Sequence, residues 1–217
     1  MKIYSFLILF ILLIPNALAW NSYYHKSLAE KAYYSLDFET QEKLNLSMIQ
    51  YGATTPDLVF HDVVKHHYPP SYYLAERWLE SAKSNYSLGN YNEASYSFGI
   101  ASHYITDSFV SPHYISKEPG SLHSQFENID KKYKFKSKCS SFKYNLNQTL
   151  YHGSLNKKDW TSWLLTKEQE IPKKELEQAL TALYPIAQET FNSSCNNFET
   201  EVVKRKFSLL NFLDIFK

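Results

Sequence analysis

Apolar side chains recur every three to four residues along much of the chain, the spacing that places them on one face of an α-helix. The helices predicted from this pattern span residues 24–36, 71–88, 90–109, 122–135 and 172–185. No segment alternates between apolar and polar residues as a half-buried strand does. The pattern therefore predicts an all-α fold.

Capping residues, glycines and prolines mark the expected helix ends. Asn90 and Glu93 resemble a capping box, and Gly89 is typical of the helix end before it. Ser121 follows a Pro-Gly turn and is expected to cap the helix from 122. Pro185 is expected to kink or break the last helix. With no linker and no internal repeat, the chain is expected to form one domain.

The first nineteen residues have the pattern of a secretory signal peptide. Lys2 precedes an apolar run over 3–14, which is too short to span a bilayer comfortably. Residues 17–19 match the small-x-small pattern of a cleavage site. Cleavage would make Trp20 the new N-terminus and deliver the protein to the exterior, either secreted or in the cell envelope. A retained signal anchor is the alternative. The helical domain is then expected over 20–205, with a tail over 206–217.

Charge and motifs exclude several classes of function. Without the signal, which contains one lysine, the chain keeps 22 basic side chains against 22 acidic ones. This balance argues against duplex nucleic acid as a partner, because duplex-binding proteins usually carry a basic excess. The chain has no glycine-rich phosphate loop and no G-x-S-x-G elbow, so neither a nucleotide cofactor nor a serine nucleophile is supported. We expect a monomer.

Cys139 and Cys195 are the two cysteines of the chain. In an exported protein such a pair is expected to form a disulfide. The bond would close a long loop and stabilise the fold by about 4 kcal/mol.

Residues 101–127 concentrate side chains that bind metals. His103 and Asp107 are four residues apart, as are His123 and Glu127, and His113 lies between the pairs. On a helix, residues four apart share a face with Cβ atoms about 5–6 Å apart. Imidazole and carboxylate donors without thiolates suit zinc. A single pair of this kind is commonly a salt bridge, but two pairs and a third histidine indicate a multinuclear metal site.

Further donors lie upstream in the sequence. Asp57 ends the loop 52–57, His66 and His67 follow it, and His25 lies five residues after Trp20. Taken singly, each is as typical of a helix cap, a surface residue or a half-buried helix position. Their order along the chain, taken with the donors at 103–127, is more informative than any one of them.

The whole array resembles the zinc-dependent phospholipase C and single-strand-specific nuclease superfamily. Its members are secreted, all-helical phosphodiesterases with a trinuclear zinc cluster, and their mature chain begins with a Trp that binds zinc. The resemblance covers about residues 20–135. The positions that match the family's ligands, in the family's order, are Trp20, His25, Asp57, His66, His103, Asp107, His113, His123 and Glu127. The family's spacing favours His66 over the neighbouring His67, which stays the alternative.

The resemblance implies a role for each of these donors. One zinc would be held by Asp57, His66, His103 and Asp107, a second by Trp20 and His25 with Asp107 as a bridge, and a third by His113, His123 and Glu127. Asp57 would orient or deprotonate the attacking water, with Glu127 as the second choice.

The substrate depends on positions beside the ligands. Glu127 is the residue type of the phospholipases, whereas the short gap from Trp20 to His25 is more like the nucleases. The positions that depart from the family's recognition residues are Tyr23, Leu58 and Val63 for choline, and His67 and Pro69 for a nucleobase. We expect phospholipase C-like hydrolysis of phospholipid head groups or other phosphodiesters, with transient contact to a membrane surface. Hydrolysis of single-stranded nucleic acid is the alternative within the superfamily, and a non-catalytic, metal-stabilised helical binding protein is the alternative from another class.

Overall fold

The computed structural model describes residues 22–62, 64–116, 118–140 and 143–196. The predicted signal, Trp20 and the predicted tail lie outside these ranges. Within them the chain is helical and forms no strand; one isolated β-bridge joins Leu36 and Cys195. The predicted all-α, single-domain class is confirmed. None of the described helices has both the length and the apolar character needed to cross a bilayer.

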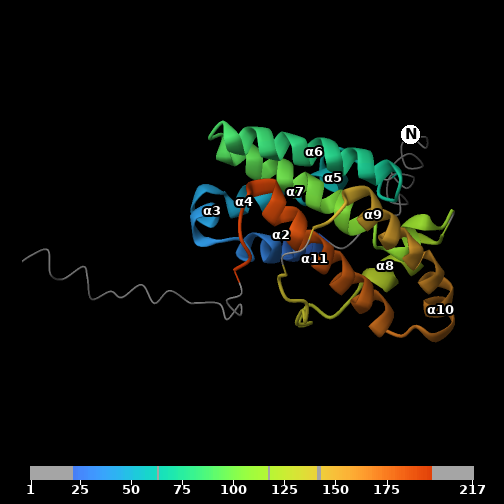
Figure 1. Cartoon of the computed structure of the whole chain (residues 1–217). Coiled ribbons are helices and arrows are strands. Elements are labelled where there is room, and N and C mark those ends of the chain that lie inside the picture. Colours follow the sequence, from blue (N-terminus) through green and yellow to red (C-terminus); the bar gives the residue numbers. More distant parts are fainter. Residues whose placement is uncertain (1–21, 63, 117, 141–142, 197–217) are drawn as a thin grey trace, which may run out of the picture.

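The helices pack around α7, as Figure 1 shows. In chain order they are α2 (Ser22–Tyr34), α3 (Phe38–Lys43), α4 (Leu46–Gly52), α5 (Thr55–Leu58), α6 (Pro70–Ser87), α7 (Tyr91–Asp107), α8 (Gly120–Glu127), α9 (Leu146–Ser154), α10 (Asp159–Thr166) and α11 (Glu170–Phe191), with 3-10 turns η1 (Ser111–Tyr114) and η2 (Leu155–Lys158). Helices α6 and α7 form the most extensive helix pair, and α2, α4 and α11 also contact α7.

Helix α7 is buried on every side over its last three turns. All residues from Ser97 to Asp107 are buried, including Ser102, His103 and Thr106. A helix that is buried all round is normally apolar on every face, and charged side chains are almost never fully buried unless they are paired. The polar groups of α7 therefore need partners inside the protein.

Two glycines allow α4 and α7 to cross at very short range. A Cβ on Gly99 would lie 2.2 Å from the carbonyl oxygen of Ile49 and 2.9 Å from the Cα of Gly52. A Cβ on Gly52 would lie 2.3 Å from the carbonyl oxygen of Tyr96. The crossing places the end of α4, and Ala53 after it, directly against α7.

The predicted helix over 122–135 is wrong in its second half, because α8 ends at Glu127. Tertiary hydrogen bonds hold the following residues in a non-helical path. The Tyr24 hydroxyl donates to the carbonyl oxygens of Ile129 and Asp130 at 3.2 and 2.9 Å. The Glu177 carboxylate accepts from backbone N–H groups further along this segment. Partners on α2 and α11 thus replace the local bonds that a helix would make.

Other helix-end predictions are also corrected. The predicted break at Pro185 does not occur, because α11 continues through it to Phe191. The residues of α11 around this proline are buried, and α11 packs on α2, α6 and α7, so tertiary packing keeps the helix continuous. Asn90 makes no side-chain capping bond, and α8 begins at Gly120, one residue before the predicted cap Ser121.

The predicted disulfide between Cys139 and Cys195 is present, with Cα atoms 6.0 Å apart. It ties the segment after α8 to the chain beyond α11. The two cysteines are 56 residues apart in sequence, which corresponds to a stabilisation of about 4 kcal/mol from loop closure.

Candidate metal centre

The structure brings eight of the nine predicted site residues into one cluster. They come from six segments that surround the end of α7: His25 from α2, Asp57 from α5, His66 from the loop before α6, His103 and Asp107 from α7, His113 from η1, and His123 and Glu127 from α8. None of these side chains is more than 7% exposed. Trp20, the ninth, lies outside the described residues.

Asp107 lies at the centre of the cluster, at the last position of α7. Its Oδ1 is 3.5 Å from Nε2 of His25. Its Oδ2 is 2.7 Å from Nδ1 of His66 and 3.1 Å from Nε2 of His103. The two oxygens of one buried carboxylate thus face histidines from three different segments.

Several buried polar atoms of the cluster have no hydrogen-bond partner in the described part of the chain. They are Nε2 of His25, His66 and His103, and both carboxylate oxygens of Asp107. Unsatisfied buried polar groups are rare, and a buried group left without a partner is costly. Imidazole nitrogens and carboxylate oxygens that converge without mutual hydrogen bonds are the donor set of a zinc site. The residues present therefore fit the metal.

The donor atoms form three groups. Within each group every residue contributes one ligand atom, and these atoms lie within 4.8 Å of one another. The groups are His25 with Asp57 and His103, His66 with Asp107 and His113, and His113 with His123 and Glu127. The third group has the membership that the resemblance implies. The first two differ from the implied sets, because His25 groups with Asp57 and His103, whereas His66 and Asp107 group with His113.

Hydrogen bonds at Nδ1 orient three of the imidazole rings. Nδ1 of His103 is 2.9 Å from the carbonyl oxygen of Ala53, and Nδ1 of His113 is 3.2 Å from that of Asp107. A carbonyl accepts only, so each Nδ1 donates a proton to it, and Nε2 is the ring nitrogen that faces the cluster and could bind a metal. Nδ1 of His25 is 3.4 Å from the Thr106 hydroxyl. Such outer bonds orient metal-binding histidines.

Sequence reasoning missed Glu118, which lies in the loop before α8. One oxygen of its carboxylate contacts Nδ1 of His123, while Nε2 of His123 is 2.7 Å from Oε1 of Glu127. His123 therefore has a carboxylate on each side. Glu118 precedes the helix, so no helical spacing connected it to His123, and the sequence held no signal that could have identified it.

Burial lowers the pKa values of the cluster histidines His25 and His103, whereas nearby carboxylates raise them. Burial lowers the pKa of His25 to about 3, and the neighbouring His103 adds to this effect. Burial acts in the same direction on His103, but the carboxylates of Asp107 and Asp57 outweigh it and raise that pKa to about 10. Burial would raise the pKa of Asp107, yet His103, His25 and His113 hold it well below its usual range. Metal binding would therefore displace a proton from His103, because a ligand must be deprotonated.

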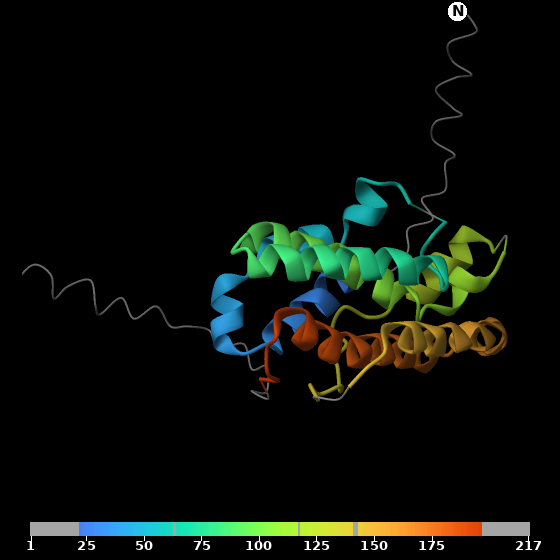
Figure 2. The same ribbon diagram turned by 45° about the horizontal axis from the view of Figure 1, so that its top comes forward.

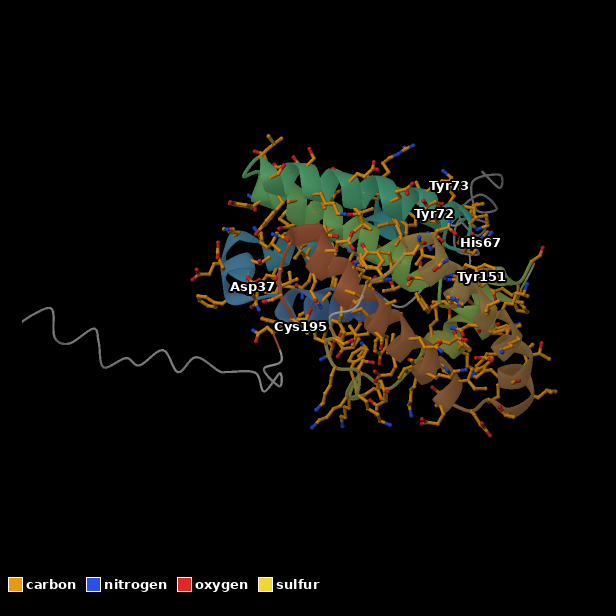
Figure 3. The ribbon with its side chains drawn as sticks, in the orientation of Figure 1. Asp37, His67, Tyr72, Tyr73, Tyr151 and Cys195 are labelled. Carbon is orange, nitrogen blue, oxygen red and sulfur yellow. A yellow bond between two sulfur atoms is a disulfide. The ribbon has the colours of Figure 1, made fainter. Side chains whose placement is uncertain are left out.

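The structure places His66, and not His67, among the cluster donors. The His66 side chain is 6% exposed and within reach of both Asp57 and Asp107. His67 is half-buried, packs its ring against Tyr114 at 5.8 Å, and lies at the end of the molecule where α6 begins (Figure 3). This arrangement favours His66 as the ligand.

Glu175 is a buried carboxyl on α11 behind the turn that carries His113. Its Oε2 accepts a 2.9 Å hydrogen bond from the N–H of Ser111, and its Oε1 has no partner among the described residues. Burial raises the pKa of Glu175 well above the usual 4.5, and the bond from Ser111 offsets only part of this rise. In the folded protein this carboxyl therefore stays neutral between pH 4.5 and its raised pKa.

Glu175→Gln is expected to become more stable relative to the wild type as the pH rises from 4.5. Above this pH the unfolded wild-type chain releases a proton that the folded chain retains, so stability falls with rising pH. Glutamine keeps the shape and the acceptor oxygen but does not titrate. Denaturant unfolding across a pH series measures the difference. Glu170→Gln, at an exposed position of the same helix, should show no such increase, and a pH-independent difference for Glu175→Gln would contradict the assignment.

A family model described as zinc dependent phospholipase C matches residues 24–192 of the chain. The matched range contains all eight clustered side chains. A search of curated proteins finds no match.

Proposed function

Because the chain belongs to the zinc-dependent phospholipase C family, we propose that it is a secreted phosphodiester hydrolase that holds three zinc ions and acts as a phospholipase C. The observation that carries the proposal is the buried Asp107 carboxylate, whose oxygens face three histidines without forming hydrogen bonds. One carboxylate shared among several nitrogen donors supports a bridging role between two ions. The family supports zinc as the metal and a phosphodiester as the substrate.

The proposed ligand sets keep Asp107 as the bridge. They are Asp57, His66, His103 and Asp107 for one ion, Trp20, His25 and Asp107 for the second, and His113, His123 and Glu127 for the third. Zinc would lower the pKa of a bound water to about 7 and neutralise charge on the phosphoryl oxygens. Asp57 would orient or deprotonate that water, since its side chain is 5% exposed and 3.5 Å from Nε2 of His103. Glu127 is the second candidate for this role.

Phospholipid is the proposed substrate, because Glu127 is the residue type of the phospholipases at this position. Single-strand-specific nuclease activity is the alternative within the superfamily. A non-catalytic, metal-stabilised helical protein is the alternative from another class. The number and burial of converging donors argue against it, since a structural zinc site is built from four ligands around one ion.

Metal analysis and a side-by-side assay test the proposal. We expect close to three zinc ions per chain, and hydrolysis of phosphatidylcholine or other phospholipids in preference to single-stranded DNA and RNA. A folded protein that contains no zinc would refute the enzyme proposal. Zinc with hydrolysis of single-stranded nucleic acid alone would assign the protein to the nuclease branch.

Processing is expected to complete the site. Only cleavage after Ala19 converts the Trp20 nitrogen from a peptide amide into an amine that can bind zinc. A protein that retains residues 1–19 should bind the second zinc poorly and hydrolyse phosphodiesters poorly, compared with one that begins at Trp20. Zinc content and hydrolysis of the two forms measure the effect. Full activity with three zinc ions in the unprocessed form would rule out this role of Trp20.

A further inference from the structure

Four apolar side chains are exposed together between two of the cluster residues, Asp57 and His66. Leu58 is 51% exposed, Val59 49%, Phe60 44% and Val64 68%. The short helix α5 turns Asp57 into the cluster, so the residues that follow point outward. Clustered exposure of this kind, as opposed to single exposed side chains, is typical of an interaction site.

Hydrogen bonds hold this segment in a defined shape. Asp62 accepts from the N–H groups of Val64 and Lys65 at 3.2 and 3.1 Å and from the Tyr104 hydroxyl at 3.1 Å. The N–H of Phe60 donates to the carbonyl oxygen of Thr55 at 3.0 Å. In Figure 2, α5 and the chain after it (cyan) stand out above α6. The apolar side chains are therefore presented outward by an anchored segment.

A cavity of about 530 Å³ lies between this segment and α6. Its lining includes Phe60, Asp62, Lys65, Arg77, Trp78 and Tyr104. Lys65 and Arg77 are exposed and form no ion pair within the described parts of the chain. Asp62, the one carboxylate in the lining, is already engaged by Tyr104 and the backbone. With two cations against this one carboxylate, the lining has a net positive charge beside an apolar wall, which suits an anionic, partly apolar ligand.

Tyr104 links the cavity to the candidate metal centre. Its ring centroid is 5.8 Å from that of His66 and 5.6 Å from that of His103. A molecule in the cavity is thus separated from the cluster by one side chain.

We propose that Leu58, Val59, Phe60, Val64, Lys65 and Arg77 form an interfacial surface that docks onto bilayers containing anionic phospholipids, with the cavity receiving an anionic head group. Apolar side chains that enter the head-group region, combined with flanking cations, give a peripheral protein affinity for anionic membranes. The docking rests on these residues alone. Docking would also present lipid to the metal centre for cleavage, and this consequence rests on the proposed function.

The same residues fit single-stranded nucleic acid less well. Bases need free aromatic faces on which to stack, whereas Phe60 and Trp78 stack on each other, with centroids 6.2 Å apart and planes at 19°. The remaining exposed apolar side chains of this surface, Leu58, Val59 and Val64, are aliphatic. Aliphatic side chains partition into lipid but offer no stacking surface.

Vesicle co-sedimentation tests the surface, with phosphatidylcholine vesicles that contain or lack phosphatidylglycerol. The wild type should bind the anionic vesicles more tightly. The double variant Lys65→Gln/Arg77→Gln should lose about thirtyfold in affinity for them, which corresponds to about 1 kcal/mol for each cation. Phe60→Ser/Val64→Ser should weaken binding to both vesicle types by about tenfold. Thermal unfolding checks that the variants are folded.

Matched controls lie elsewhere on the molecule. Leu165→Ser removes an apolar side chain that is 83% exposed on α10, and Lys83→Gln removes an exposed cation further along α6; both should bind vesicles like the wild type. Equal binding to the two vesicle types, unchanged binding in the double variants, or loss of single-stranded DNA binding in place of vesicle binding would overturn the proposal. The expected vesicle binding without hydrolysis of any phosphodiester would support the surface and refute the hydrolase. Hydrolysis by a protein whose vesicle binding is the same in the wild type and the double variants would support the hydrolase and refute the surface.

Discussion

Asp107→Ala is expected to abolish phosphodiester hydrolysis and to lower the zinc content of the protein. The side chain is fully buried, and its two oxygens face His25, His66 and His103. If it bridges two ions, its removal takes a ligand from both at once. The loss of activity should exceed roughly 10–100-fold, which is the usual effect of removing a residue that only hydrogen-bonds to a metal ligand. Zinc analysis and hydrolysis rates of the purified variant measure both effects.

Two comparisons make this result specific. Asp130→Ala removes an exposed carboxylate outside the cluster and should keep the zinc content and the rate of the wild type. His103→Ala should also abolish hydrolysis, because it removes a donor that neighbours both Asp57 and Asp107. Wild-type-like turnover in Asp107→Ala would refute the bridging role.

Gly99→Ala is expected to lower the free energy of unfolding by about 1–3 kcal/mol or more, as overpacking of a core does. Alanine is the better helix former by up to about 1 kcal/mol, but the new methyl group would lie 2.2 Å from the Ile49 carbonyl oxygen. Helix α4 must then move away from α7. Ala53 follows α4 and holds Nδ1 of His103, so zinc content should fall as well. Denaturant unfolding and metal analysis test the two effects.

Gly89→Ala provides the matched control. Gly89 has a φ of 77° and nothing within 4 Å of an added Cβ. The same substitution there should cost about 1–2 kcal/mol from backbone conformation alone, with no change in zinc content. Stability and zinc content of Gly99→Ala equal to those of the wild type would contradict the close crossing of α4 and α7.

The helices that the sequence predicts best are long. Helices α6 and α7 begin and end close to the predicted residues, because each has enough turns to show a helical period and Gly89 separates them. Short elements such as α4, with seven residues, and α5, with four, carry too few turns to show a period. They nevertheless hold the Gly52 crossing and Asp57. The extension of α8 past Glu127 was wrong for a different reason, since hydrogen bonds from Tyr24 and to Glu177 override the local preference.

The helical class, the disulfide partners and the donor pairs within single helices follow from the sequence alone. His103 with Asp107, and His123 with Glu127, are neighbours wherever their helices lie, because covalent spacing on a helix sets their separation. Which segments meet at the cluster depends on how the helices pack. Tertiary packing brings His25, Asp57 and His66 to Asp107 and leaves His67 outside the cluster. It also places Glu118 beside His123 and turns the side chains after Asp57 outward. These distances depend on how closely helices from separate parts of the chain pack, and that is set by contacts such as the crossing at Gly52 and Gly99, which no local pattern records.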